Sequence, residues 1–248
     1  MVRGLRPHVV GREILSADVR DPKLAPIAPA LNLPATVVSL SRRGKYILFD
    51  LGDRILVLHL RMSGRLAWGT REPTGKVRLS LRFPRGAAHL VDPRRLGTAA
   101  VVERFADELG PEPFGDLAWL PVALARSRMP IKLWLMDQKK IAGIGNIYAA
   151  EILFRAGISP TRPAASLSRT EVARLEDAIP SVLERAIAAG GTTLADGLYR
   201  GPTGESGEFR YELSVYGREG EPCLRCGARI ERSLLGGRGT YSCPRCQS

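Results

Sequence analysis

Four cysteines constrain the fold of this chain more than any other feature of its sequence. They form two Cys-x-x-Cys pairs, Cys223–Cys226 and Cys243–Cys246, with residues 227–242 between them. Two such pairs can place four thiolates around one Zn²⁺ in a tetrahedron, which leaves no coordination position for a substrate. A disulfide framework would instead spread its cysteines through a smaller secreted chain. The spacing therefore predicts one structural zinc ion on a C-terminal β-hairpin, and catalysis must come from other residues.

The net charge favours a polyanionic partner. The 248 residues include 37 Lys and Arg against 25 Asp and Glu, which gives a formal net charge of +12. Nucleic acid is the commonest polyanion that such proteins bind. GC-rich arginine codons could produce the same excess, so the location of the charge matters more. Residues 126–160 hold six Lys or Arg against two acids, which concentrates the excess in one segment.

Nothing in the sequence indicates a membrane segment. No apolar run approaches the ~20 residues that a bilayer-spanning helix needs, and residues 1–8 lack the apolar core of a secretion signal. We therefore expect a cytoplasmic protein that makes no contact with a membrane.

The pattern of apolar residues changes along the chain. Short β-branched or alternating runs with Gly, Pro and Asp turns fill the first 105 residues and indicate a β-sandwich or barrel. These runs are residues 35–40, 46–49, 54–59 and 77–83. A Pro/Gly-rich stretch follows at 109–115. Helical periodicity then predicts helices over residues 118–127, 131–138, 147–156 and 169–189.

The helix ends carry recognisable signals. Ser168 followed by Glu171 forms a capping box, Gly157 ends the third helix, and Pro180 should kink the last one. Gly143-Ile-Gly145 predicts a tight turn, with Asn146 as the N-cap of the next helix. Backbone N–H groups at such a turn suit a phosphate. Glycines chosen only for helix packing are the alternative explanation.

The most informative segment of the chain is Asp137-Gln-Lys-Lys-Ile-Ala-Gly-Ile-Gly-Asn-Ile-Tyr-Ala-Ala-Glu151. Together with the cysteine pairs that follow it, this segment resembles the formamidopyrimidine-DNA glycosylase and endonuclease VIII family. The resemblance extends from Arg3 to Gln247. It implies an α+β multidomain fold with a β-sandwich, a helical domain that contains a helix–two-turn–helix motif, and a zinc β-hairpin. The expected segments are a sandwich domain at 1–108, a linker at 109–117, the helical domain at 118–198, and a lesion loop with zinc finger at 199–248.

The resemblance also implies a function. It identifies a bifunctional DNA glycosylase and AP lyase of base-excision repair, which flips a damaged base out of double-stranded DNA, removes it and nicks the strand. Residues 200–208 and 211–218 resemble the branch that processes 8-oxoguanine and formamidopyrimidines. The expected partner is duplex DNA with oxidised bases or abasic sites. We expect a bacterial monomer associated with the nucleoid.

Residues of the first domain receive roles by resemblance. Lys45 in Arg-Arg-Gly-Lys-Tyr matches a lysine that contacts the damaged base or a phosphate and assists catalysis. Met62 in His-Leu-Arg-Met-Ser-Gly matches a residue that fills the void left by the flipped nucleotide. Asp-Pro-Arg94-Arg95-Leu96-Gly matches another DNA-binding segment of the family. In the family the first arginine, Arg94 here, pairs with the orphaned base, and Leu96 stands where the family commonly has a phenylalanine that wedges the base stack. Without the family, Lys45 is an exposed strand-entry lysine and Met62 a core residue.

Residues of the second domain match phosphate contacts. By resemblance, Lys132, Asn146 and Arg238 hold phosphates around the extruded nucleotide, although Arg238 could also be a solvated loop arginine. Glu151 matches a family glutamate, but we interpret it as a helix acid that favours the macrodipole.

The start of the sequence differs from the family pattern. Family members begin with a Pro-Glu-Leu-Pro-Glu-type segment that supplies a proline nucleophile and a glutamate acid. This chain begins Met1-Val2 and contains neither. A start codon assigned several residues too late is the interpretation we favour, because Lys45, Met62 and Arg94 look like an intact lesion site. The alternatives are a catalytically silent damaged-DNA-binding zinc protein of the same fold and, ranked last, a ribbon protein that binds protein or RNA.

Overall fold

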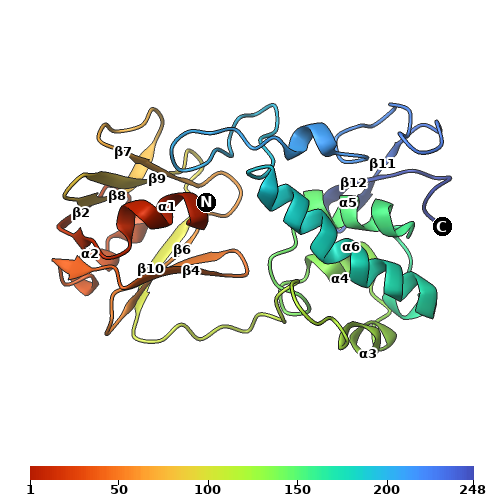
Figure 1. The fold of residues 1–248 in the computed structure, drawn as a ribbon, viewed down its shortest axis with the longest axis horizontal. Coiled ribbons are helices and arrows are strands. Elements are labelled where there is room, and N and C mark those ends of the chain that lie inside the picture. Colours follow the sequence, from red (N-terminus) through yellow and green to blue (C-terminus); the bar gives the residue numbers. More distant parts are fainter. The chain divides into compact units, whose positions relative to one another are not determined.

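The computed structural model describes all of residues 1–248 and divides them into two compact units. Unit 1 comprises residues 1–107 and 190–210, and unit 2 comprises residues 108–189 and 211–248. Figure 1 shows the elements of each unit coloured along the sequence. None of the helices is long and apolar enough to span a lipid bilayer.

Two four-stranded antiparallel sheets form the body of unit 1, as the predicted sandwich requires. One sheet has the order β10-β6-β5-β4 and the other the order β2-β8-β9-β7. The strands of the first sheet are β4 (Ser39–Arg43), β5 (Tyr46–Asp50), β6 (Ile55–His59) and β10 (Thr98–Val102). Those of the second are β2 (Ser16–Val19), β7 (Arg65–Gly69), β8 (Val77–Phe83) and β9 (Gly86–Val91). A short pair, β1 (Glu13–Ile14) with β3 (Ala35–Thr36), completes the strands.

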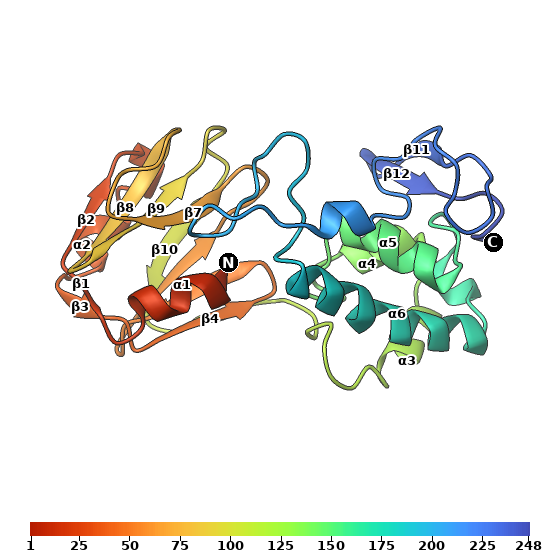
Figure 2. The ribbon, with the colours of Figure 1, turned by 45° about the horizontal axis from the view of Figure 1, so that its top comes forward.

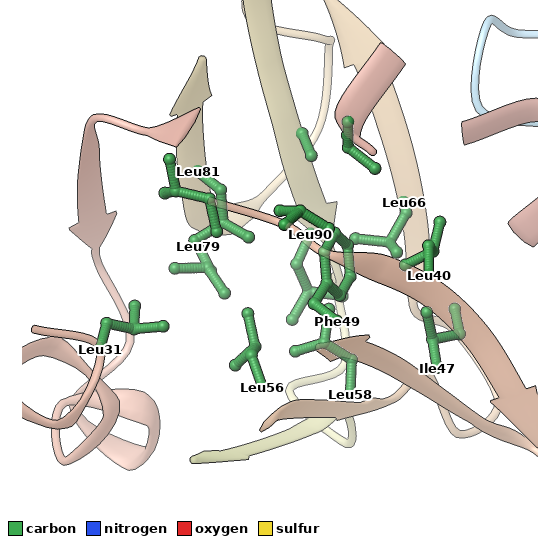
Figure 3. Packing of buried hydrophobic residues seen from close by; sticks show 14 of the residues in the cluster. Leu31, Leu40, Ile47, Phe49, Leu56, Leu58, Leu66, Leu79, Leu81 and Leu90 are labelled. Carbon is green, nitrogen blue, oxygen red and sulfur yellow. The ribbon is translucent and has the colours of Figure 1, made fainter. Parts of the chain in front are cut away.

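The core of unit 1 lies between the two sheets. Alternate residues of each strand point inward, because successive side chains of a β-strand face opposite sides. Figure 3 shows these side chains meeting around Phe49, which is fully buried. The labelled core residues come from both sheets and from the segment before β3: Leu31, Leu40, Ile47, Phe49, Leu56, Leu58, Leu66, Leu79, Leu81 and Leu90.

Helices also contribute to unit 1. Helix α1 (Val2–Val9) was not among the predicted elements, because arginines and Pro7 mask its pattern. Leu5 and Val9 lie one turn apart on the same face and are fully buried. The remaining short helices are η1 (Pro22–Leu24) and α2 (Ile27–Ala30).

Residues 190–210 return to unit 1 after the helices of unit 2. The backbone N–H of Trp68 donates to the carbonyl of Pro202 at 2.6 Å. A Cβ at Gly4 of helix α1 would lie 2.9 Å from Cγ of Pro202, so the two segments are in close contact. The sequence offered no signal for this return.

Unit 2 contains the four predicted helices and the predicted hairpin (Figure 2). They are α3 (Leu120–Ala125), α4 (Ile131–Met136), α5 (Asn146–Ala156), α6 (Arg169–Ala188), β11 (Glu231–Leu235) and β12 (Arg238–Ser242), with the 3-10 turn η2 (Ala164–Ser166). The 3-10 turn η3 (Phe209–Glu212) contains residues of both units. The capping box of α6 is confirmed: the hydroxyl of Ser168 accepts from the N–H of Glu171 at 3.3 Å, and the Glu171 carboxylate accepts from the N–H of Ser168 at 2.7 Å. Gly157 ends α5 in the left-handed conformation, with φ of 71°. Helix α6 continues through Pro180 to Ala188.

Candidate nucleic-acid interface and metal centre

Two loops and a turn of unit 1 leave the same end of one sheet. Tyr46, His59 and Thr98 lie side by side on β5, β6 and β10. The β4–β5 turn precedes Tyr46, the loop 60–64 follows His59, and the loop 92–97 precedes Thr98. Because neighbouring strands are antiparallel, all three connections lie at the same end of the sheet. The register thus brings the predicted site residues of unit 1 together.

The β4–β5 turn carries Lys45, which is exposed. Burial, together with the charges of Arg61 and Lys45, lowers the pKa of His59 to about 4. His59 is therefore neutral at physiological pH, and its Nδ1 accepts a hydrogen bond from the N–H of Arg61 at 3.0 Å. The His59 ring also meets Tyr46 edge-on, with centroids 4.7 Å apart. Sequence reasoning gave His59 no role.

Apolar side chains stand exposed on both loops. Met62 is 68% exposed and Leu96 is 39% exposed, so Met62 is not a core residue. Each directly follows an arginine in the left-handed region, Arg61 with φ of 54° and Arg95 with φ of 56°. Such a conformation is unfavourable for a residue with a side chain and persists where the surroundings hold it in place.

Asp92 connects the two loops. It is 1% exposed, and its Oδ1 accepts from the hydroxyl of Ser63 at 2.5 Å while its Oδ2 accepts from the N–H of Gly97 at 2.7 Å. Burial alone would raise the pKa of Asp92, but the hydrogen bonds from Ser63 and from the loop backbone lower it on balance. The sequence shows an aspartate before Pro-Arg-Arg, yet nothing in it identifies Ser63 as the partner.

The two arginines of the second loop differ in their surroundings. Arg95 forms a bidentate ion pair with the buried Asp21, at 2.9 Å from Nε and 2.7 Å from Nη2. This contact lowers the pKa of Asp21 to about 2, and the Arg95 side chain remains 45% exposed. Arg94 is exposed, and its guanidinium has no protein partner. Arg94 is therefore the arginine of this loop whose guanidinium is not engaged within the protein.

In unit 2 the zinc hairpin gathers the predicted phosphate-binding residues. Lys132 on α4 is fully buried, and its ammonium donates to the carbonyl of Gly239 at 3.0 Å and to Oγ1 of Thr240 at 2.6 Å. Burial and the nearby charge of Arg238 lower the pKa of Lys132 to about 8. The amide of Asn146 donates to the same Gly239 carbonyl at 3.1 Å. Arg238 is exposed at the start of β12.

The prediction that Asn146 caps α5 was wrong. The N-cap is Gly145, and Asn146 is the first helical residue. The Asn146 side chain donates to the hairpin instead of capping the helix. Gln138 shapes the turn instead: its Oε1 accepts from the N–H of Gly143 at 2.9 Å, and its Nε2 donates to the carbonyl of Ile144 at 3.0 Å. The N–H of Gly143 is therefore already bonded within the protein.

The interpretation of Glu151 as a helix acid that acts only on the macrodipole was also wrong. Glu151 is 5% exposed, and its carboxylate accepts three backbone N–H groups, from Ser214 at 2.8 Å, Val215 at 3.0 Å and Tyr216 at 2.9 Å. The partners lie more than sixty residues away, so helical position alone could not reveal them. Glu151 anchors the segment that leads into the zinc hairpin.

The four cysteines meet as the spacing predicts. One sulfur atom from each lies within 4.8 Å of the others, and the cysteines form no disulfide. The Cys223–Cys246 and Cys226–Cys243 sulfur pairs are 3.9 and 3.5 Å apart. A tetrahedral Zn²⁺ with Zn–S bonds of about 2.3 Å needs sulfurs about 3.8 Å apart. The cluster therefore fits one structural zinc ion.

The hairpin between the cysteine pairs has a tight turn. Leu235 pairs with Arg238, and Gly236 and Gly237 have φ of 57° and 71°, as a two-residue type I′ turn requires. A Cβ at Gly236 would lie 2.8 Å from Cδ2 of Leu133, so the turn packs closely against α4. Its position next to α4 places Arg238 near Lys132.

Three family models match consecutive parts of the chain. Residues 1–99 match the formamidopyrimidine-DNA glycosylase N-terminal domain, residues 109–197 the formamidopyrimidine-DNA glycosylase H2TH domain, and residues 220–248 the zinc finger found in FPG and IleRS.

Curated relatives match over nearly their full length. Formamidopyrimidine-DNA glycosylases of Thermus thermophilus and of an Exiguobacterium species are 42% and 43% identical to the chain. Each alignment covers 99% of this chain, with 94% and 95% of the relative respectively.

Solved structures match equally well. The crystal structure of the MutM (FPG) protein of Thermus thermophilus has a TM-score of 0.91 at 41% identity, over 99% of this chain and 95% of that one. A Lactococcus lactis FPG mutant in complex with Fapy-dG-containing DNA also has a TM-score of 0.91, at 32% identity, over 100% and 96% of the two chains. A Lactococcus lactis Fpg complex with abasic-site DNA has a TM-score of 0.89 at 33% identity, with the same coverage.

Proposed function

The chain belongs to the formamidopyrimidine-DNA glycosylase family, and from this membership we propose that it is a base-excision-repair glycosylase and AP lyase for oxidised purines in duplex DNA. The observation that carries the proposal is that Lys45, Met62 and Arg94 lie on three connections at the same end of the first sheet. These residues come from three separate motifs, and a family role is assigned to each. The relatives are bacterial, which supports action in the bacterial cytoplasm on nucleoid DNA. We expect the protein to act as a monomer.

Unit 1 supplies the groups for a flipped nucleotide. Extrusion of a base leaves a void in the duplex and costs a few kcal/mol. Met62 and Leu96 are exposed apolar tips that can enter this void and wedge the stack. Arg94 has an unpaired guanidinium for the edge of the orphaned base. Arg95, held by Asp21 but half exposed, is placed for a phosphate.

Unit 2 supplies groups for the phosphate backbone. Arg238 is exposed on the hairpin, and Asn146 lies at the start of α5. Lys132 is buried beneath the same hairpin, so we assign it to supporting Arg238 and to adding positive charge near the backbone. The structural zinc fixes the hairpin on which these contacts depend.

The family resemblance assigns the covalent step to an N-terminal proline. Its amine would attack C1′ of the sugar, displace the damaged base and form a Schiff base, with the following glutamate moving protons and Lys45 assisting. Elimination of the phosphate then nicks the strand. The sequence starts Met1-Val2, without a Pro-Glu pair at these first positions, so the test of this step uses two forms of the protein.

The test compares the 248-residue chain with a form that begins with the family's Pro-Glu segment ahead of Arg3. Each is incubated with matched duplexes that contain 8-oxoguanine or guanine opposite cytosine, and strand cleavage and binding are measured. We expect both forms to prefer the lesion duplex and the Pro-Glu form to cut it. Lesion-selective binding without cleavage by the Pro-Glu form would identify a silent damage-binding protein. Equal binding to both duplexes without cleavage would refute the proposal.

A further inference from the structure

The loops 60–64 and 92–97, called the two filler loops from this point on, are joined through one buried carboxylate. We propose that Asp92 is a positioning residue that couples the filler loops, so that Met62 and Leu96 enter the DNA as one unit. This inference rests on the proposed function, because it assumes that these two side chains fill the void. It adds that neither loop acts independently of the other.

The first support is the set of bonds around Asp92. Its two carboxylate oxygens bond to different loops, one to the hydroxyl of Ser63 at 2.5 Å and the other to the N–H of Gly97 at 2.7 Å. The N–H of Arg94 also approaches Oδ1, at 3.3 Å. Ser63 and Asp92 are 2% and 1% exposed, so water cannot readily replace a broken bond. If one loop shifted alone, a buried charged group would lose its partner, which is strongly unfavourable.

The second support is backbone strain next to both tips. Only three residues other than glycine have positive φ in this structure, and two of them, Arg61 and Arg95, directly precede Met62 and Leu96. Each of these two arginines is held by a residue outside its own loop. His59 Nδ1 accepts from the N–H of Arg61, and the Asp21 carboxylate pairs with the Arg95 side chain. The residue before each tip is therefore held in place before any DNA binds.

The third support is the lack of space at the loop ends. A Cβ at Gly64 would lie 2.4 Å from the carbonyl oxygen of Leu60, and a Cβ at Gly97 would lie 3.1 Å from Oδ2 of Asp92. The backbone at each loop end is thus in close contact with the start of the same loop. This close packing opposes changes of shape within each loop, and the Ser63–Asp92–Gly97 connection links one loop to the other.

Coupling of this kind predicts cooperative void filling. Once one tip is removed, the remaining loop can no longer place the other tip optimally in the void. Removing both Met62 and Leu96 should then cost less binding free energy than the sum of the two separate losses. Binding to undamaged duplex should not depend on the connection, because it comes from phosphate contacts.

The experiment is a double-mutant cycle on the full chain. Met62→Ala, Leu96→Ala and the double variant are made in three backgrounds: wild type, Ser63→Ala and Ser80→Ala. Ser80 is the matched control, since it is also 2% exposed and its hydroxyl is hydrogen-bonded within unit 1, to His89 at 2.8 Å. Kd is measured for a duplex with a stable abasic-site analogue and for an undamaged duplex. Asp92→Asn provides a fourth background that keeps the side-chain shape and removes the charge.

In the wild-type and Ser80→Ala backgrounds, the two substitutions should be non-additive by about tenfold in Kd, as for residues that share a network. In the Ser63→Ala and Asp92→Asn backgrounds this factor should fall toward one, with little change in Kd for undamaged DNA. Additive effects in the wild type, or the same coupling in all backgrounds, would overturn the inference and leave the proposed function intact. If neither single substitution weakens abasic-site binding, void filling by these residues is itself wrong.

Discussion

Glu151, Lys132 and Asp92 are buried polar residues that each bond to a segment distant in the sequence. Glu151 binds the backbone of residues 214–216, Lys132 binds β12, and Asp92 binds the loop 60–64. A buried charge without partners is strongly destabilising, whereas a well-bonded one fixes the relative positions of the segments it joins. These residues therefore determine where the exposed candidate DNA contacts lie.

Substitution Glu151→Gln should destabilise unit 2 by about 1–3 kcal/mol, because an amide replaces one acceptor oxygen with a donor that faces backbone N–H groups. Chemical denaturation would measure this loss, and hydrogen exchange at the Val215 amide should accelerate. Glu184→Gln is the matched control, since Glu184 is an exposed glutamate on α6. Equal effects of the two substitutions would contradict the anchoring role of Glu151.

The depressed pKa of His59 predicts a pH dependence of stability. Between pH about 6.5 and about 4, His59 is protonated in the unfolded chain and neutral in the folded one, so the unfolded state binds more protons. The free energy of unfolding should therefore decrease as the pH falls through this window, by at most about 1.4 kcal/mol per pH unit from this residue.

The measurement compares wild type with His59→Asn by urea denaturation at pH 7, 6, 5 and 4. The asparagine keeps an acceptor near the N–H of Arg61 and does not titrate. The variant should show a shallower loss of stability toward acid. Parallel curves for the two proteins would show that His59 is not responsible.

At the residue scale the sequence allowed us to predict which residues belong to the candidate sites, but not all of the groups that they contact. The cysteine spacing was sufficient, because ligand number and geometry follow from two Cys-x-x-Cys pairs alone. For Asn146 and Glu151 the helical position suggested a local role, while the actual partners are Gly239 and the backbone of residues 214–216. Such partners depend on the tertiary fold and leave no local pattern.

The zinc hairpin β11–β12 is the element on which the candidate contacts of unit 2 depend. Lys132 and Asn146 both donate to Gly239 within it, and Arg238 starts β12. A hairpin of two five-residue strands is marginally stable by itself, so the four thiolates and the metal supply much of its stability.

Removal of zinc with a chelator under reducing conditions should therefore unfold the hairpin. Hydrogen exchange should show loss of protection at Thr240 and Ser242, which pair with Ser233 and Glu231, while the Phe49 amide in the unit 1 core stays protected. Affinity for lesion duplex should fall together with hairpin protection, and added Zn²⁺ should restore both. Retained protection at Thr240 after complete zinc removal would contradict this account.

Among the elements, those with a strong period were predictable and the others were not. The four helices of unit 2 and the strands β5, β6 and β8 have clear apolar patterns. Strand β9 begins Gly-Ala-Ala-His, which lacks the β-branched residues that mark a strand. Helix α1 contains Pro7 and two arginines and shows its apolar face only through Leu5 and Val9.

Across the whole molecule, the excess positive charge should make DNA binding strongly dependent on salt. The formal net charge is +12, and candidate contacts lie on both units. Charge alone cannot distinguish an arginine that holds a phosphate from one that contacts a base, but the salt dependence of each variant can.

Arg238→Ala should weaken binding to all duplexes and reduce the slope of log K against log salt concentration by about 0.9, as expected for one phosphate contact. Arg94→Ala should change the slope less and should alter the preference for the base opposite the lesion. Fluorescence anisotropy over a salt series, with each of the four bases opposite an abasic-site analogue, measures both. Identical behaviour of the two variants would contradict their assigned roles.

Trapping of the covalent intermediate tests the central claim most directly. The form with the Pro-Glu segment ahead of Arg3 is incubated with 8-oxoguanine duplex and sodium borohydride, which reduces a Schiff base to a stable protein–DNA bond. We predict a trapped complex on the lesion strand, with none on the matched guanine duplex. Absence of any trapped complex, while lesion-selective binding persists, would contradict the assignment of this protein as a glycosylase with lyase activity.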